Sequence, residues 1–599
     1  MKNFLKTLLA STVGVIIGAI IFTFLMFSFL MGIAASSGSS PYLVEDNTIL
    51  KLDLNGMLYE QATESPLGTL LGEPAPLGLD DVLVAIKKAK ENDKVKGIYI
   101  KSGYLESGVA GVDAIRRELM DFKKTGKFVV SYGDIYSQSG YYLASVSDKI
   151  IMNPQGMLEF QGLSTNIQFV KNFYDKIGVK YQVFKVGTFK SAVEPLIQDK
   201  MSDANRQQIT SYMGNIWEHI LDGVSESRNI SKENLNRYAD KFLLFSDPDS
   251  ILSYNMIDSL LYESKVEEYL KTLVNIGKDE KLKFASVQNM VSVPVKEKNK
   301  ENKIAVLFAE GSIIDDDSGS PLFQDKSITA KQYVKELNDL RDNDEVKAVV
   351  FRVNSRGGSA YASEQIWNAV KELRAKKPVI VSMGDYAASG GYYISCGANA
   401  IVAEPTTLTG SIGIFGLLPN GEELAKKMGY SYDEVNTNKH SSWGGRAFGI
   451  PFIVTALSRG LNAEESGMVQ AYVERGYDYF LSRCAEGRSK TKADIDSIGQ
   501  GRVWTGNQAL QLGLVDKLGG INDAIELAAK TADIESYSIS KYPAKKPFFE
   551  QLMESSIAET KVKVVKMFVS NEDYERSLLM KDINNLDIQM AVMPDKINF

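Results

Sequence analysis

The chain has 599 residues, and its 75 acidic side chains outnumber its 68 Lys and Arg side chains, for a net charge of −7. A chain of this length exceeds what one hydrophobic core usually supports, so we expect at least two domains. Hydrophobic residues make up 44% of the chain and charged residues 24%, which is typical of folded globular proteins. The charge is dispersed, without the basic stripe of a nucleic-acid-binding surface, and that class of protein is excluded.

The N-terminus predicts a membrane anchor over residues 1–36. Lys2 and Lys6 precede a run from Thr7 to Ala35 that contains no charged residue. The apolar part of a secretory signal spans about 7–15 residues, whereas a bilayer needs about 20, so this run is long enough to span. The two lysines place the N-terminus in the cytoplasm and everything after Ser36 outside it. A signal cleaved near Ala34 to Ser36 is the alternative.

An internal repeat divides the rest of the chain. A Ser-x-Gly-Asp phrase at 131–134 recurs at 382–385, and Gly-Tyr-Tyr at 140–142 recurs at 391–393, both at a shift of 251 residues. One shift kept over about 60 residues indicates one domain present twice. We therefore expect a first repeat at 47–285, a linker at 286–303, a second repeat at 304–540 and a tail at 541–599, to which no function is assigned.

Strand and helix patterns alternate within each repeat. In the second repeat, the runs 304–308, 348–353 and 379–383 are rich in β-branched residues and predict buried strands. The segments 333–341 and 364–375 between them have the periodicity of helices. This order predicts parallel strands joined by crossover helices, and hence an α/β fold.

Glycine-rich segments follow three predicted strands of the second repeat, at 354–359, 387–391 and 408–416. Glycines allow backbone amides to approach a ligand and to stabilise the negative charge of a carbonyl under attack. At the shift of 251, the first repeat has Glu, Ser and Phe where the second has Gly357, Gly358 and Ser411. We therefore predict Ser411 as a nucleophile, with the amides of Gly357 and Gly358 as its oxyanion hole.

The first repeat contributes a distinctive segment at 187–195, Gly-Thr-Phe-Lys-Ser-Ala-Val-Glu-Pro, whose Lys190 corresponds to a serine in the second repeat. A lysine activates a serine only when it is neutral, and burial among Phe189, Ala192 and Val193 would favour the neutral form. We predict one composite site with Lys190 as the general base.

No metal or cofactor is expected. The chain has two histidines and two cysteines, and none of them forms a cluster with the spacing of metal ligands. Cys396 lies in an apolar run and is predicted to be a core residue, and two cysteines cannot form a disulfide framework in so long a chain.

Three phrases, at 187–195, at 408–416 and at 502–506 followed by 513–516, resemble the signal peptide peptidase A (protease IV) family of the long, tandem-repeat type. The resemblance covers nearly the whole chain. It implies two crotonase- or Clp-protease-like repeats behind a transmembrane helix, and a Ser–Lys dyad at Ser411 and Lys190. It also implies a homo-tetramer in the bacterial inner membrane, with a periplasmic catalytic domain that degrades cleaved signal peptides.

The chain departs from the family pattern in two places. Arg356 replaces a proline beside the predicted oxyanion glycines, and a Ser/Thr-rich stretch after the nucleophile reads Val435 to Asn438. Thr437, within that stretch, is the residue we expect to orient Lys190.

Three other interpretations compete. Ser389, in a Clp-like Ala-Ala-Ser-Gly setting, is the rival nucleophile, and a histidine relay to it would have to use His440. The fold could instead bind an acyl-CoA thioester, as crotonases do. The chain could also be a non-catalytic, membrane-tethered scaffold. Asp385, which recurs as Asp134, is predicted to be structural.

Overall fold

The computed structural model describes residues 6, 11–15, 17–18, 21, 41–62, 76–294, 302–315, 326–442, 458–544 and 590–592. Most of the predicted anchor lies outside these residues. Among the residues described, no helix is both long and apolar enough to cross a membrane.

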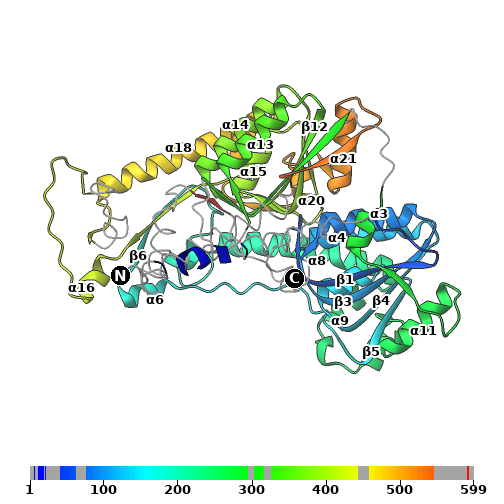
Figure 1. Ribbon diagram of the computed structural model, residues 1–599. Helices are drawn as coiled ribbons and strands as arrows, with labels where there is room; N and C mark the ends of the chain where they lie inside the picture. The colour runs from blue at the N-terminus through cyan, green and yellow to red at the C-terminus, as the bar shows by residue number, and fades with distance from the viewer. Residues whose placement is uncertain are drawn as a thin grey trace.

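The first repeat is built on a parallel sheet in the order β2-β1-β3-β4-β5-β7, with β8 pairing along β1. Helices α3, α4 and α5 connect its strands, and α8 to α12 follow (Figure 1). The strands are β1 (Thr48–Tyr59), β2 (Leu77–Gly78), β3 (Val95–Glu106), β4 (Phe128–Tyr136), β5 (Lys149–Leu158), β7 (Ser259–Leu260) and β8 (Lys283–Ala285). The helices are α3 (Leu79–Glu91), α4 (Val109–Lys123), α5 (Gln138–Ala144), α8 (Asp203–Arg228), α9 (Lys232–Ala239), η1 (Leu243–Phe245), α10 (Pro248–Ser253), α11 (Glu263–Leu273) and α12 (Val287–Ser292).

The second repeat has a sheet in the order β18-β16-β14-β12-β9-β20, in which β15 pairs with β14 and β19. Its strands are β9 (Lys303–Glu310), β12 (Val346–Ser355), β14 (Val379–Ala388), β15 (Ala400–Ala403), β16 (Leu408–Gly410), β18 (Val503–Thr505), β19 (Lys517–Leu518) and β20 (Ser538–Tyr542). Its helices are α13 (Ala330–Asp342), α14 (Ala360–Arg374), α15 (Gly390–Ser395), α16 (Glu422–Lys427), α18 (Ala463–Arg488), α19 (Lys492–Ile498), α20 (Gly506–Gln511) and α21 (Ile521–Thr531). The predicted strands and helices of this repeat are all present.

The shift of 251 residues is a structural repeat. Helices α3 and α13 have the same length and are related by this shift, and so are α4 and α14. Strands β3 and β12 begin 251 residues apart, as do β4 and β14. The predicted α/β fold is confirmed. The interval 286–303 contains helix α12, which packs on α3, so part of the predicted linker belongs to the first repeat.

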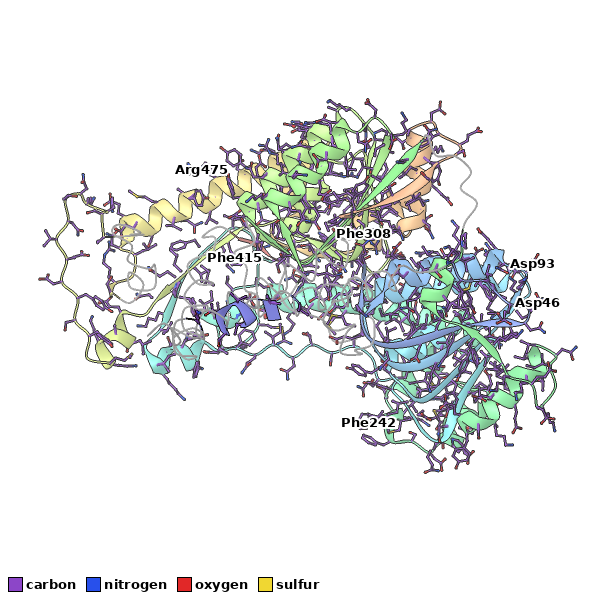
Figure 2. All side chains as sticks on the ribbon, viewed as in Figure 1. Asp46, Asp93, Phe242, Phe308, Phe415 and Arg475 are labelled. Atoms are coloured by element: carbon purple, nitrogen blue, oxygen red, sulfur yellow. The ribbon has the colours of Figure 1, made fainter. Side chains whose placement is uncertain are left out.

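A third sheet combines strands from both repeats and from the tail, in the order β11-β10-β13-β21-β17-β6. Its members are β6 (Lys180–Lys185), β10 (Ser312–Ile314), β11 (Ser327–Thr329), β13 (Gly357–Ser359), β17 (Phe415–Asn420) and β21 (Met590–Val592). Strand β6, with α6 (Lys171–Ile177), extends in an arm beside α16, away from the other two sheets (Figure 1). Phe415, labelled in Figure 2, begins β17 where this arm meets the second repeat.

Charged groups join the two repeats, and two of them, Arg352 and Glu60, are buried. The guanidinium of Arg352 on β12 donates to the carboxylate of Glu60 beyond β1, with Nε–Oε2 at 2.8 Å and Nη2–Oε1 at 3.0 Å. Asp385 on β14 accepts a hydrogen bond at 3.0 Å from the backbone N–H of Gly111, in the first turn of α4. These contacts lock the two halves in one arrangement, because an unpaired buried charge is costly.

Candidate active site

Lys190 reaches the second repeat because β6 leaves the first repeat. Strand β6 pairs antiparallel with β17 from Lys185 opposite Phe415 to Lys180 opposite Asn420. Beyond β6 the chain continues along the second repeat: the N–H of Val186 donates to the carbonyl of Ile414 at 3.2 Å, and that of Phe189 to the carbonyl of Gln500 at 2.8 Å. Backbone pairing thus carries a lysine of the first repeat into the second.

The Lys190 side chain is completely buried between two serines. Its Nζ lies 2.7 Å from Ser389 Oγ, 3.2 Å from Ser411 Oγ and 3.3 Å from the carbonyl oxygen of Ser411. All three residues have no exposed surface. The structure therefore brings the lysine of the first repeat together with serines of the second, as the repeat predicted. Both candidate serines lie within hydrogen-bonding distance of the one amine.

Burial holds the pKa of the Lys190 amine well below its ordinary value of 10.5. Desolvation disfavours the charged form of a lysine, and no carboxylate is among its hydrogen-bond partners. The apolar setting expected from the sequence includes Val193, which is buried at 1% exposure. A lowered pKa favours the neutral form of the amine, which is the form in which a lysine can accept a proton.

Two glycines leave room for this lysine. A Cβ on Gly501, whose φ is +77°, would lie 2.7 Å from the Lys190 backbone nitrogen and Cβ. A Cβ on Gly413 would lie 3.2 Å from Lys190 Cδ. Contacts below about 3 Å are not tolerated without movement, so Gly501 in particular permits the close passage of the Lys190 backbone.

Ser389 occupies a strained turn between β14 and α15. Its φ of +55° and ψ of −114° are unusual for a residue with a side chain, and its hydroxyl makes no cap bond to the helix. The corresponding helix of the first repeat, α5, starts from Ser137 with φ −63° and ψ 161°, and that hydroxyl accepts from the Gly140 N–H. Ser389, the N-cap residue of α15, makes no such bond to its helix, and its hydroxyl lies beside the Lys190 amine instead.

Ser411 lies just after β16 and also contacts the amine. Its N–H donates to the Arg502 carbonyl at 2.7 Å, and its own φ is +50°. Both its hydroxyl and its carbonyl face the Lys190 amine, so it contacts the lysine twice where Ser389 contacts it once.

Gly357 and Gly358 belong to β13, which contacts α15. Gly357 has φ +106°, and its N–H donates to Ser355 Oγ at 3.1 Å. A Cβ on Gly358 would lie 2.0 Å from the Ile313 carbonyl oxygen. Both positions thus require glycine for the fold itself, and the amide of Gly357 is already engaged. Arg356, in place of the family's proline, lies with its guanidinium carbon 5.7 Å from the ring centre of Tyr386.

Gln208 on α8 is a buried residue that the sequence did not single out. Its Nε2 donates to the Phe189 carbonyl at 3.0 Å and to Ser191 Oγ at 2.9 Å, on either side of Lys190. Its Oε1 accepts from the Val503 N–H at 3.2 Å. Gln208 therefore joins the lysine segment to β18. A lone glutamine in a helix offers no sequence signal for such a role.

Two other predicted residues lie elsewhere. Thr437 is exposed and makes none of the hydrogen bonds found at Lys190, so its predicted role is wrong: the hydroxyls that meet the lysine belong to Ser389 and Ser411. His440 lies 3.1 Å from Glu465 Oε1 and 3.7 Å from Glu464, and is not among the contacts of Ser389. The two carboxylates hold this imidazole away from a relay to Ser389.

Asp385 and Cys396 have the structural roles that were predicted for them. Asp385 anchors α4, as described above. Cys396 is fully buried in the core of the second repeat, and its thiol donates a hydrogen bond to the carbonyl oxygen of Tyr393 at 3.2 Å. Among the described residues, no group of three or more His, Cys, Asp or Glu side chains could hold a metal ion.

Comparison with known proteins agrees with the motifs. The model of Peptidase family S49 matches residues 121–277 and 371–535, and that of Clp protease matches residues 321–406. The chain is 34% identical over 512 residues to "Protease 4" of Haemophilus influenzae, covering 82% of this chain and 80% of that protein. It is 35% identical over 523 residues to "Protease 4" of Salmonella typhi, covering 84% and 82%. It is 30% identical over 494 residues to "Serine protease SPPA, chloroplastic" of Arabidopsis thaliana, covering 82% and 70%. With both repeats matched by one family model, this chain belongs to peptidase family S49.

Proposed function

We propose that this chain is a membrane-anchored serine endopeptidase in which Ser389 is the nucleophile, Lys190 the general base and Ser411 the residue that positions the lysine. The observation that carries the assignment is the turn at Ser389, a strained strand-to-helix turn whose hydroxyl lies 2.7 Å from a fully buried amine. Such a turn presents a serine oxygen for attack, as in nucleophile elbows. The proposal reverses the preference for Ser411 drawn from the sequence.

The contacts of Lys190 fit a neutral amine, which has two hydrogens to donate and one lone pair to accept. The carbonyl of Ser411 can only accept, so it takes one N–H, and the Ser411 hydroxyl takes the other. The lone pair is then left for the proton of Ser389, at the shortest of the three distances. In this arrangement Lys190 activates the Ser389 hydroxyl, and Ser411 holds the lysine amine in the orientation that this requires.

The reaction follows from this division. Lys190 accepts the Ser389 proton as Oγ attacks a peptide carbonyl, and the resulting ammonium protonates the leaving amine. The neutral lysine then takes a proton from the water that attacks the acyl-enzyme. The resulting ammonium returns this proton to Ser389 Oγ as the bond between Oγ and the acyl carbon breaks. The backbone amides of Gly358 and Gly390 are the candidates for stabilising the oxyanion, since the Gly357 amide donates to Ser355.

The substrate and location belong to the same proposal. The family motifs support cleaved signal peptides as substrates and a homo-tetrameric assembly. The uncharged run from Thr7 to Ala35 behind two lysines supports a single-pass anchor in the bacterial inner membrane, with the catalytic part in the periplasm. No cofactor takes part in the proposed chemistry.

The experiment compares peptide hydrolysis and labelling by a serine-directed acylating probe across four variants. Ser389→Ala and Lys190→Met should lose at least about 1,000-fold in kcat/KM, as when a nucleophile or its base is removed from other serine hydrolases. Ser411→Ala should keep Ser389 labelling and lose about 10- to 100-fold in kcat. Ser395→Ala is the matched control, since this buried serine of α15 bonds only to its own helix, at the Gly391 carbonyl.

Peptide mapping of the labelled wild-type protein decides between the serines. Label on Ser389 supports the proposal, whereas label on Ser411, surviving in Ser389→Ala, would restore Ser411 as nucleophile. Absence of label and of hydrolysis in a folded protein would favour the scaffold interpretation. Retention of the protein on an acyl-CoA thioester resin would favour crotonase-like binding.

A further inference from the structure

The phrase Arg-Val-Trp-Thr-Gly at 502–506 has no part in the chemistry proposed above. Residues 503–505 of this phrase form β18, which pairs antiparallel with β16, so that Val503 lies opposite Gly410. Strand β16 leads into Ser411, whose N–H donates to the Arg502 carbonyl at 2.7 Å. The phrase therefore lies against the strand that leads to one of the two site serines.

The residues just before β18 run along the lysine segment. The N–H of Phe189 donates to the Gln500 carbonyl at 2.8 Å. Gly501 passes so close to Lys190 that a Cβ on it would lie 2.7 Å from the lysine backbone nitrogen. The N–H of Gly501 donates to the Ile412 carbonyl at 2.7 Å. These residues thus contact both the lysine segment and the turn after β16.

The Arg502 side chain contacts two aromatic rings. Its guanidinium carbon is 4.9 Å from the ring centre of Phe189 and 4.2 Å from that of Trp504. Its Nε is buried and, within the described part of the chain, has no hydrogen-bond partner. Burial lowers the pKa of this guanidinium. The cation is held by the faces of the two rings, to which guanidinium groups are attracted.

Phe189 precedes Lys190 in the chain, so a movement of its backbone also moves the lysine. Its carbonyl accepts from Gln208 Nε2 at 3.0 Å, and its ring contacts Arg502. The glutamine therefore fixes the main chain at this point, and the arginine fixes the direction of the side chain. A displacement of about 1 Å at a reacting group can cost about 100-fold in rate.

We propose that Arg502 is a positioning residue for the general base, which it holds in place through the ring of Phe189. The inference rests on the proposed peptidase function. The same arginine also holds the turn after β16, because its carbonyl accepts from the Ser411 N–H. It acts through these two residues, since the hydrogen bonds of the Lys190 amine go to Ser389 and Ser411.

The first test measures hydrolysis of a fluorogenic peptide. Arg502→Met keeps an unbranched side chain but removes the guanidinium, and it should lower kcat by about 10- to 100-fold with KM unchanged. Phe189→Leu removes the same contact from its other partner. The double variant should lose no more than the larger of the two single losses, because both changes act through one contact.

Arg475→Met is the matched control. This exposed arginine of α18, labelled in Figure 2, lies 5.7 Å from the ring centre of Tyr472, and its variant should keep the wild-type kcat. A wild-type kcat in folded Arg502→Met would overturn the inference, and so would losses that multiply in the double variant. An increase in KM confined to peptides with a free C-terminal carboxylate, with kcat unchanged, would assign the guanidinium to the substrate instead. Phe189→Leu carries the same predictions if Arg502→Met does not fold.

A second readout follows the lysine itself and needs no hydrolysis. Burial lowers the pKa of Lys190, so this lysine makes the stability of the wild-type protein rise with pH up to about 10.4. Once the guanidinium is gone and the segment moves, water reaches the amine, its pKa rises and this contribution shrinks. In urea unfolding at pH 7 and pH 9.5, Lys190→Met should therefore have a smaller effect in the Arg502→Met background than in the wild-type background. An effect of the same size in both backgrounds would contradict the inference.

The two readouts separate this inference from the proposed function. A smaller effect of Lys190→Met in the Arg502→Met background, with no hydrolysis by the wild-type protein, would keep Arg502 as the residue that positions the lysine and refute the peptidase. Hydrolysis by the wild-type protein, with kcat and the effect of Lys190→Met both unchanged in the Arg502→Met background, would refute the inference alone.

Discussion

Replacing Lys190 by methionine should abolish hydrolysis and, at pH 7, stabilise the protein. The amine is fully buried, and burial lowers its pKa because the charged form loses its hydration. Methionine is unbranched, of similar length and uncharged, so it can fill the same space between Gly413 and Gly501. Activity and stability should therefore change in opposite directions.

The gain in the free energy of unfolding can be estimated from the surroundings of Lys190. A lysine in the unfolded chain has a pKa of about 10.4, so keeping it fully neutral at pH 7 costs about 4.6 kcal/mol. Its three hydrogen bonds return about 1 kcal/mol each, and these are lost in the variant. The free energy of unfolding should thus rise by about 1–3 kcal/mol in Lys190→Met.

The gain should also depend on pH. Between the lowered pKa of folded Lys190 and about 10.4, the unfolded state binds one proton more than the folded state, so the stability of the wild-type protein rises with pH. The variant lacks this contribution. Its advantage is therefore largest at low pH and should shrink towards pH 10.

Urea unfolding at pH 7 and pH 9.5 measures both effects, with Lys200→Met, at an exposed lysine, as the control that should change neither. A Lys190→Met protein that is less stable than wild type at pH 7 would refute the reasoning. So would an advantage of the same size at both pH values.

Two further predictions concern the surroundings of the site. Gly501→Ala should lower kcat by about 100-fold, because a Cβ at φ +77° would lie 2.7 Å from Lys190 and displace the base, and Gly214→Ala, in open space on α8, should leave kcat unchanged. Burial, followed by the charge of Glu60, raises the pKa of Asp385 to about 6. The folded carboxyl then binds its proton more tightly than the unfolded one, so about 3 kcal/mol of stability present near pH 4 should be lost as pH rises through 6. The Asp385→Asn protein should not lose this stability when its urea unfolding is measured over the same pH range. An identical pH dependence of the free energy of unfolding in both proteins would contradict the prediction.

Much of the fold could be predicted from local sequence patterns. The elements from 304 to 383 follow from apolar periodicity, which depends only on neighbouring residues. The repeat followed from a constant shift of 251, and it pointed to Lys190 as the contribution of the first half. The same comparison could have identified Ser389, since the first repeat has Gln138 in its place. A serine at this position needs a base, and the sequence offered only His440 as a histidine partner for Ser389 in the second repeat.

The sequence could not predict which of the two serines, Ser389 or Ser411, lies nearer the Lys190 amine. Ser389 and Ser411 both follow predicted strands and both lie beside glycines, so spacing alone does not separate them. The difference lies in backbone dihedral angles and in distances of 2.7 and 3.2 Å to an amine contributed by the other repeat. Thr437 was assigned by position in a motif, and the structure places it on an exposed segment.

By itself the sequence determined the α/β class, the duplicated domain, the family and the pairing of a lysine from one half with a serine from the other. The tertiary structure alone decided which strands form the third sheet, which hydroxyl lies nearest the Lys190 amine, and that residues 590–592 lie beside β13. The physical reason is the range of the interactions. Periodicity and turns arise between near neighbours in the chain. The meeting of residues 190, 389 and 411 depends on contacts across about 200 residues of the chain, and no local pattern records them.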